Sequence, residues 1–141
     1  LRSLFGVGRD PGAERGERGE RLAAAWLERE RDFRIVARNW RNPRDRREEL
    51  DLVARDGEVL VFVEVKSRDA GALVPGYYAV DARKKRVLRR AVRSYLNALA
   101  AHRPRTIRFD VVEVALSAEG TGGARILHFE NIPLFSKHFH G

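Results

Sequence analysis

The sequence predicts a mixed α/β domain, a β-sheet flanked by helices in the order α-β-β-β-α-β-β. Two observations carry this prediction. An Asp-Gly pair separates two runs of alternating apolar residues within residues 50–66, which is a strong signal of a β-hairpin. Apolar residues also recur at helical spacing in residues 13–31 and 81–101. The length of 141 residues fits one domain, and we expect a flexible arm over 1–12, the domain over 13–130 and a tail over 131–141.

Each element follows from a local pattern. The first helix carries Ala23 and Leu27 on one stripe, while the second begins at an Asp81 N-cap and buries Leu88 and Tyr95. A meander of three strands followed by a helical crossover predicts a fourth strand parallel to the middle or the edge strand of the meander. The other predicted elements are a strand over 33–39, a polar loop over 40–48, an irregular segment over 67–78, a strand over 105–116, a Gly-rich turn over 117–124 and a strand over 125–130.

The hairpin assigns its side chains to two faces. A two-residue loop at Asp56-Gly57 places Asp51 opposite Phe62, Leu50 opposite Val63 and Glu49 opposite Glu64. One face is entirely apolar and must pack on another layer; it carries Leu50, Leu52, Ala54, Val59, Val61, Val63 and Val65. The other brings three carboxylates and a lysine to the open end of the hairpin; it carries Glu49, Asp51, Val53, Leu60, Phe62, Glu64 and Lys66.

Asp51 and Glu64 become diagonal neighbours in this arrangement, about 7–8 Å apart at the backbone, so that both carboxylates can reach one ion. Like charges repel unless a proton, a cation or the nearby Lys66 compensates them, which is the pattern of a metal site. The alternative is a half-solvated sheet with a charged outer face. Glu20 shares the inward stripe of the first helix, either as an acid favoured by the helix dipole or as a further ligand.

The charge balance points to a polyanionic partner. The formal net charge is +8 and the isoelectric point is near 10.7, which favours nucleic acid, although a ribosomal or membrane-surface role gives the same balance. The absence of cysteine excludes a disulfide framework and a thiolate zinc site. No apolar run approaches the length of about 18–20 residues that crosses a bilayer, and we expect a cytoplasmic protein without a membrane partner.

An acid at the start of one strand, followed by Glu-x-Lys on the next, resembles the PD-(D/E)xK nuclease signature, and the element order is similar to the restriction-endonuclease-like core. The local sequence resembles more specifically the YraN-like family of predicted endonucleases, which are distantly related to Holliday-junction resolvases. The similarity covers most of residues 16–114; it lies in the segments GERGERLAAAWL, ARNWR, EELDLVARDGEVLVFVEVKSR, AVDARKKRVLRRAVRSYL and RFDVVEV.

The resemblance implies a metal-dependent endonuclease that hydrolyses phosphodiester bonds in DNA, branched DNA included. It implies that Asp51 and Glu64 bind a divalent ion, that Glu20 completes the site and that Lys66 assists hydrolysis. Oxygen ligands suit Mg²⁺ or Mn²⁺. Backbone phosphates are expected to contact basic residues of the 40–47 loop and the second helix, namely Arg41, Arg44, Arg46, Arg47, Lys84, Lys85, Arg89 and Arg93.

Some alternatives stay open from the sequence. Lys84 lies four residues before Leu88 and extends the apolar stripe of the second helix, so it can also point at the acidic site. A module that binds nucleic acid without cutting it would carry the same basic surface, and a ribosome- or protein-binding adaptor is a third class. Junction-cutting relatives act as dimers, so a homodimer is possible.

Overall fold

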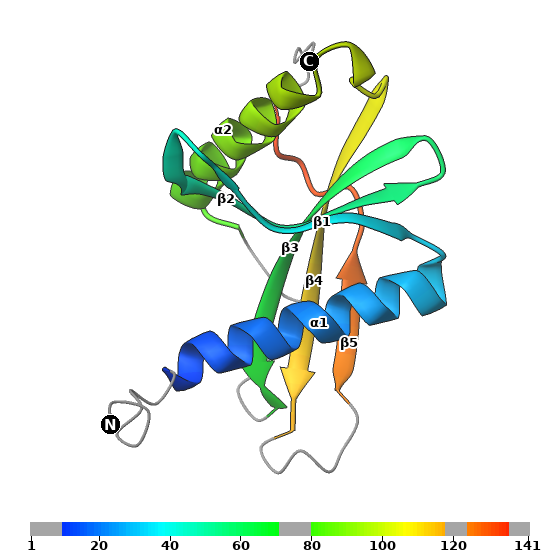
Figure 1. The fold of residues 1–141 in the computed structure, drawn as a ribbon. Coiled ribbons are helices and arrows are strands. Elements are labelled where there is room, and N and C mark those ends of the chain that lie inside the picture. The colour runs from blue at the N-terminus through cyan, green and yellow to red at the C-terminus, as the bar shows by residue number, and fades with distance from the viewer. Residues whose placement is uncertain (1–9, 71–79, 118–123, 136–141) are drawn as a thin grey trace, which may run out of the picture.

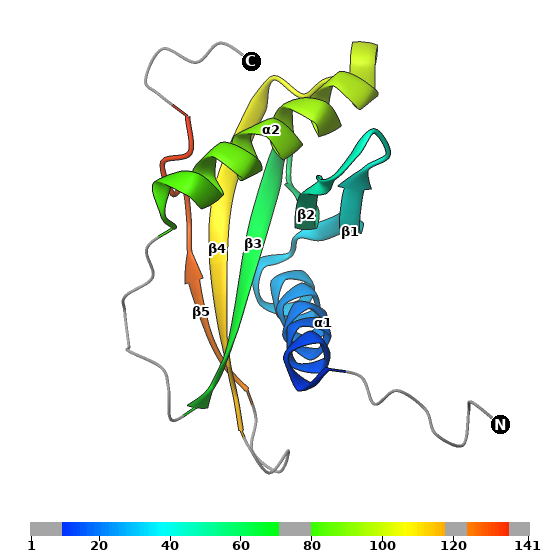
Figure 2. The same cartoon turned by 90° about the vertical axis from the view of Figure 1, so that its left-hand side faces the viewer.

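The computed structural model describes residues 10–70, 80–117 and 124–135, which form a five-stranded sheet between two helices (Figures 1 and 2). This confirms the predicted α/β class and element order, and the arrangement is consistent with a restriction-endonuclease-like core. In chain order, the elements are α1 (Pro11–Arg31), β1 (Arg34–Asn42), β2 (Asp45–Asp56), β3 (Val59–Asp69), α2 (Ala82–Leu99), the 3-10 helix η2 (Ala100–His102), β4 (Thr106–Leu116) and β5 (Arg125–Phe129).

The strands lie in the sheet in the order in which they occur in the chain. β3 and β4 are parallel, and the other neighbouring pairs are antiparallel. Parallel neighbours need a long connection, and α2 lies in the one between β3 and β4. Of the two predicted positions for the fourth strand, the structure therefore has the one beside the last strand of the meander.

The two helices cover opposite faces of the sheet, since the core consists of two clusters. α1 packs on one face through Ala23, Ala24, Leu27, Leu52, Ala54, Val61, Val63, Val65, Val112 and Val114. α2 packs on the other through Leu50, Val53, Leu60, Phe62, Leu88, Val92, Tyr95, Leu96, Phe109 and Val111. Within the described ranges, neither helix has an apolar stretch of the length that spanning a bilayer requires.

The predicted hairpin register is wrong by one step on each strand. Asp56 pairs with Val59 and Leu52 with Val63, so the turn consists of Gly57 and Glu58. The left-handed conformation of Gly57, with φ of 60°, explains the shift, because the glycine must occupy the first position of this loop. Moving both strands together keeps most side chains on their predicted faces.

Leu50 is the exception. It was expected on the face of Leu52 but belongs to the α2 cluster together with Val53. Opposite this point on β1, Asn39 has a left-handed φ of 49°, between Arg38 and Trp40, whose partners are Leu52 and Leu50. The two strands turn here as one ribbon, which breaks the alternation of side chains.

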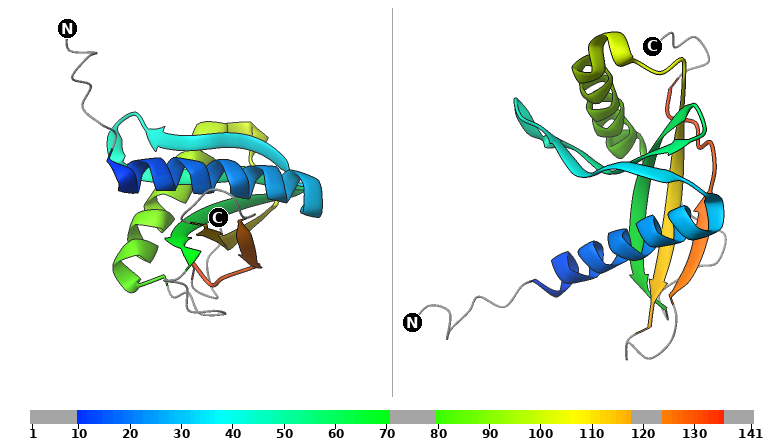
Figure 3. Two further views of the ribbon diagram at one scale, coloured as in Figure 1. Left: turned by 90° about the horizontal axis from the view of Figure 1, so that it is seen from below. Right: turned by 45° about the vertical axis from the view of Figure 1, so that its right-hand side comes forward.

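The β1–β2 ribbon continues beyond the sheet and reaches past α2 (Figure 3, right). The predicted polar loop over 40–48 is therefore wrong, because only a short turn interrupts the two strands there. The tip is tied to α2 by three side chains. Glu48 Oε2 accepts from Ser94 Oγ at 2.6 Å and from Asn42 Nδ2 at 2.8 Å. These bonds hold a strongly charged ribbon in one position.

The remaining sequence predictions are close to the structure. The second helix begins after the Asp81 N-cap, whose carboxylate accepts from the Lys84 N–H at 2.8 Å, and it ends two residues before the predicted end. The predicted irregular segment over 67–78 starts later, since β3 continues to Asp69. Its residues 71–78 lie outside the described residues, as do 118–123 of the Gly-rich turn. From the predicted tail, Leu134 is buried and its carbonyl accepts from Arg89.

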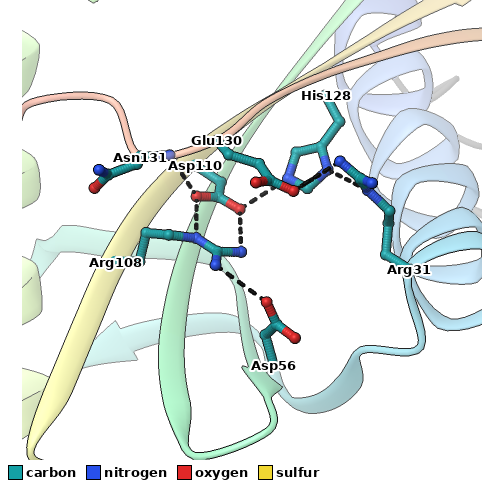
Figure 4. A network of polar contacts seen from close by, with 7 residues as sticks. All are labelled: Arg31, Asp56, Arg108, Asp110, His128, Glu130 and Asn131. Carbon is teal, nitrogen blue, oxygen red and sulfur yellow. Dashed lines mark hydrogen bonds and ion pairs between the residues drawn. The ribbon is translucent and has the colours of Figure 1, made fainter.

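A buried polar network joins β4, β5 and the start of the C-terminal segment (Figure 4). The Asp110 side chain is 0% exposed and accepts two bonds from Arg108, at 2.8 and 3.0 Å, and one from the Asn131 N–H at 2.9 Å. His128 Nε2 lies 2.8 Å from the same carboxylate. Burial alone raises the pKa of Asp110, but the bonds from His128 and Arg108 lower it overall.

α1 approaches β3 most closely at Gly19. A Cβ atom at this position would lie 1.6 Å from Ser67 Oγ and 2.8 Å from Ser67 Cβ. Nothing lies within 4 Å of a Cβ at Gly16, one turn earlier. Only a glycine at position 19 therefore permits the observed helix–strand distance.

We predict that Gly19→Ala destabilises the protein by about 1–3 kcal/mol, because the added methyl group overpacks the contact with Ser67. The cost should largely disappear in a Ser67→Gly background, which a double-mutant cycle in urea unfolding measures. Gly16→Ala is the control and should be neutral or stabilising by up to about 1 kcal/mol. Equal costs of Gly19→Ala in both backgrounds would contradict the close contact.

We predict that Asp110→Asn destabilises the protein at pH 7 by about 3 kcal/mol, because Arg108 loses its buried partner. Folding lowers the pKa of Asp110, so the ionised carboxylate stabilises the folded state. This contribution is complete at pH values well above the ordinary pKa of 3.8, and it is lost as the pH falls through the lowered pKa of the folded state. The difference between wild type and variant should thus shrink in acid. Asp69→Asn, which removes a pair with Arg15 whose Asp69 side chain is 60% exposed, should cost less than about 1 kcal/mol.

Candidate active site

The site begins where β2 separates from β3. The paired residues of the two strands extend from Asp56 and Val59 to Leu52 and Val63, and the next residues are Asp51 and Glu64. The Val65 N–H donates to Asp51 Oδ2 at 2.8 Å. A carboxylate therefore takes the place of a backbone partner where the strands diverge, which fixes the position of Asp51.

Asp51 and Glu64 meet directly. Their side chains share a hydrogen bond, and the Glu64 side chain is only 5% exposed. Burial raises the pKa of both acids, and the neighbouring Asp51 charge contributes to raising that of Glu64 to about 7. Because burial is the largest cause of both shifts and the two charges repel each other, the pair favours a bound proton or cation. The corrected register thus brings the two predicted residues closer together than the diagonal placement expected from the sequence.

Two lysines face this acid pair. Lys84 Nζ lies 3.4 Å from Glu64 Oε1, so this side chain of the first turn of α2 points toward the site. Partial burial by itself lowers the pKa of Lys84, but the Glu64 and Asp51 charges raise it overall. Lys66 lies two residues after Glu64 on the same face of β3, and its charge lowers the pKa of Glu64.

Glu20 approaches the pair from α1. Burial and then the Asp51 charge raise its pKa to about 7, while a hydrogen bond with the Asn39 side chain acts in the opposite direction. The close packing at Gly19, the preceding residue, brings this part of the helix to the sheet. The structure therefore places Glu20 within electrostatic range of Asp51, as its position on the inward stripe predicted.

Asn39 and Glu49 are the residues of the site that the sequence prediction left out. Glu49 was counted among the three carboxylates of its face but received no role; its charge acts on Glu20, Asp51 and Lys84, and its carboxylate lies 3.4 Å from Arg41. The only local signal for Asn39 is a weak one, because asparagine tolerates left-handed backbone better than most residues do. Its position beside Glu20 is visible only in the folded structure.

The donor set suits a hard divalent cation. Asp51 and Glu64 offer oxygen ligands whose mutual repulsion such a cation would relieve. They would hold the ion, with Glu20 as the third acid acting on the pair. In the part of the chain that the structure describes, however, no group of three or more acidic or histidine side chains is gathered closely enough to hold a metal. The three-acid ligand set therefore stays a prediction.

The predicted phosphate-binding residues fall into two groups. Arg41, Arg44, Arg46 and Arg47 lie on the β1–β2 ribbon, where Arg44 and Arg46 are exposed and Arg47 pairs with Asp45 at 2.9 Å. On α2, Arg89 donates to the Leu134 carbonyl and Arg93 lies over the Phe135 ring, so both face the C-terminal segment. Lys85 is half-buried, and Lys84 belongs to the acid site.

We predict that Glu20→Gln stabilises the metal-free protein at pH 8 and has little effect at pH 5. The pKa of Glu20 rises from 4.5 to about 7 on folding, so the folded state binds the proton more tightly and the contribution of Glu20 to stability falls as the pH rises through this interval. Melting temperatures at both pH values in EDTA measure the effect. Glu28→Gln, at an exposed acid of the same helix, is the control substitution. An effect of Glu20→Gln on the melting temperature that is the same at pH 5 and pH 8 would contradict the prediction.

Comparison with known proteins identifies the family. The family model described as "Uncharacterised protein family UPF0102" matches residues 19–114. Among similar proteins, a UPF0102 protein of Porphyromonas gingivalis is 42% identical over 125 residues, 88% of this chain and 87% of its own length. A UPF0102 protein of Anaeromyxobacter dehalogenans is 48% identical over 116 residues, 81% and 79% of the two chains. The expected YraN-like membership is thus confirmed without an assigned activity: the chain belongs to the UPF0102 family.

Proposed function

We propose that this protein is a metal-dependent phosphodiesterase that cuts nucleic acid, acting as a Mg²⁺- or Mn²⁺-dependent endonuclease on DNA, branched DNA included. The observation that carries the proposal is the contact between two carboxyls, the partly buried Asp51 and the buried Glu64, flanked by Lys66 and Lys84. Acids with raised pKa values beside specific charged partners are typical of functional sites, and a purely structural pair would be better compensated.

The residues divide the work of hydrolysis between them. Asp51 and Glu64 would hold the ion, which would supply polarisation of the scissile phosphate and a more acidic bound water. Lys66 orients that water or helps to remove its proton, and it stabilises the charge of the pentacovalent phosphorus. The water oxygen forms a new bond to phosphorus as one P–O bond of the backbone breaks, and the leaving oxygen takes up a proton.

The basic surface supports a nucleic-acid substrate. The chain carries a formal charge of +8, and the β1–β2 ribbon presents the exposed Arg44 and Arg46. The bonds from Asn42 and Ser94 to Glu48 hold this ribbon against α2, whose first turn carries Lys84 into the acid site. Phosphate contacts at the ribbon position a backbone without reading its sequence, which fits an enzyme that recognises shape.

One observation favours a second function, a nucleic-acid-binding module that does not cut. Lys84 already compensates Glu64, so the described acid pair has a cationic partner without a metal. In that case the basic surface remains the functional part, and the acid pair serves only to anchor α2 to β3.

We predict that the wild-type protein cleaves DNA in Mg²⁺ or Mn²⁺. Asp51→Ala and Lys66→Ala should each reduce the cleavage rate by about 100-fold or more, because the first removes a metal ligand and the second removes the lysine that acts on the attacking water. The measurement is single-turnover cleavage of labelled linear, flap and four-way-junction DNA, with RNA duplexes of the same sequence. Glu58→Ala is the matched control, since Glu58 is an exposed acid in the β2–β3 turn at the far end of the hairpin.

The outcomes separate the functional classes. Cleavage that survives both substitutions would come from a contaminating nuclease and contradict the proposal. Salt-sensitive binding to DNA without cleavage in either metal would support the non-catalytic module. Binding to another partner that barely weakens with salt would instead indicate a protein-binding adaptor, because phosphate contacts release counterions and weaken steeply.

A further inference from the structure

Lys84 occupies an unusual position for a residue of a basic helix. It is the third residue of α2, and its ammonium group lies 3.4 Å from a Glu64 carboxylate that is only 5% exposed. The neighbouring Arg83 and Arg86 are exposed. The lysine is therefore turned inward, where a charged head is retained only beside an opposite charge.

The first turn of α2 holds Lys84 in place. The Asp81 side chain accepts from the Lys84 N–H at 2.8 Å, and the Asp81 carbonyl accepts from the Lys85 N–H at 2.9 Å. The Lys84 backbone is thus fixed by the helix cap, while its side chain remains 42% exposed. The backbone is anchored, but the flexible four-carbon chain leaves the ammonium group free to change partners.

The local charges show what the ammonium group does. Lys84 interacts electrostatically with Glu64, Asp51 and Glu49, the three carboxylates of the β2–β3 end. Glu49 has a second cationic partner in Arg41, at 3.4 Å. Asp51 and Glu64 are in contact with each other and share Lys84 as a common cation.

We infer that Lys84 is a built-in counterion of the Asp51–Glu64 pair, which stabilises the two carboxylates in the metal-free protein and must yield its place when a divalent cation binds. This inference rests on the proposed metal site. Two cations attracted to one acid pair repel each other strongly at such separations, so the lysine weakens metal binding while it protects the empty site. Lys84 would thereby set the metal concentration at which the site fills.

The test is Mn²⁺ titration by calorimetry at pH 8, together with melting curves in EDTA, for wild type, Lys84→Gln, Lys84→Arg and Lys85→Gln. Lys84→Gln should bind Mn²⁺ about tenfold more tightly than wild type, because the competing charge is gone. Its melting temperature in EDTA should be lower by about 3 °C or more, and Mn²⁺ should restore it. Two control variants should bind Mn²⁺ with the affinity of wild type. Lys84→Arg keeps the positive charge, and Lys85→Gln changes only the adjacent residue.

Each result decides the question. If Lys84→Gln binds Mn²⁺ as weakly as wild type or more weakly, the inference is overturned. In that case the proposed metal site still stands if wild type binds Mn²⁺ and Asp51→Asn does not, and only the role of Lys84 is lost. An unchanged melting temperature of Lys84→Gln in EDTA also overturns it. No Mn²⁺ binding by wild type or Lys84→Gln overturns both the inference and the proposed enzyme, whereas binding by Lys84→Gln alone supports a lysine that blocks the site.

Discussion

The hydrogen bond from the Val65 N–H to the Asp51 carboxylate is the constraint on which the candidate site depends. β2 cannot pair with β3 and also turn away from the sheet, so a backbone donor of β3 loses its strand partner at that point. Asp51 satisfies this donor and thereby holds its own charge beside Glu64. The same bond brings the two acids together where β2 leaves β3, and burial there raises the pKa values of both.

Both helices reach this point from opposite faces of the sheet. α1 comes close because Gly19 lets it contact Ser67, and the next residue, Glu20, then acts on Asp51. α2 comes close because the Asp81 cap starts the helix beside the end of the hairpin, where Lys84 meets Glu64. The middle parts of two strands and parts of two helices thus surround one small region of charge.

Two of the acidic clusters among the described residues differ in how well their charge is compensated. Asp110 accepts bonds from Arg108 and Asn131, lies beside His128, and has a lowered pKa, as expected for a satisfied structural carboxylate. Glu64 is also buried and Asp51 is partly buried, but the pKa values of both are raised. Several donors compensate Asp110, whereas the pKa values of Asp51 and Glu64 are raised although Lys84 lies beside them, so a divalent cation would relieve the repulsion between these two carboxylates.

The sequence by itself determined the α/β class, the element order and the two faces of the hairpin, because the period of apolar residues depends only on local backbone geometry. It also placed Asp51 and Glu64 on one face, since a register error that moves both strands by one residue preserves the alternation. It could not place the ribbon turn at Asn39, which moved Leu50 to the other core and converted a predicted loop into paired strands.

Tertiary structure alone decided which charges meet. The contact between Lys84 on α2 and Glu64 on β3 joins residues that are 20 positions apart in the chain. The electrostatic interaction between Glu20 and Asp51 joins α1 to β2. No local pattern encodes these distances, because they follow from how closely each helix packs against the sheet and from where β2 leaves it. The residues of the site were therefore readable in the sequence, whereas their partnership is a property of the packed fold.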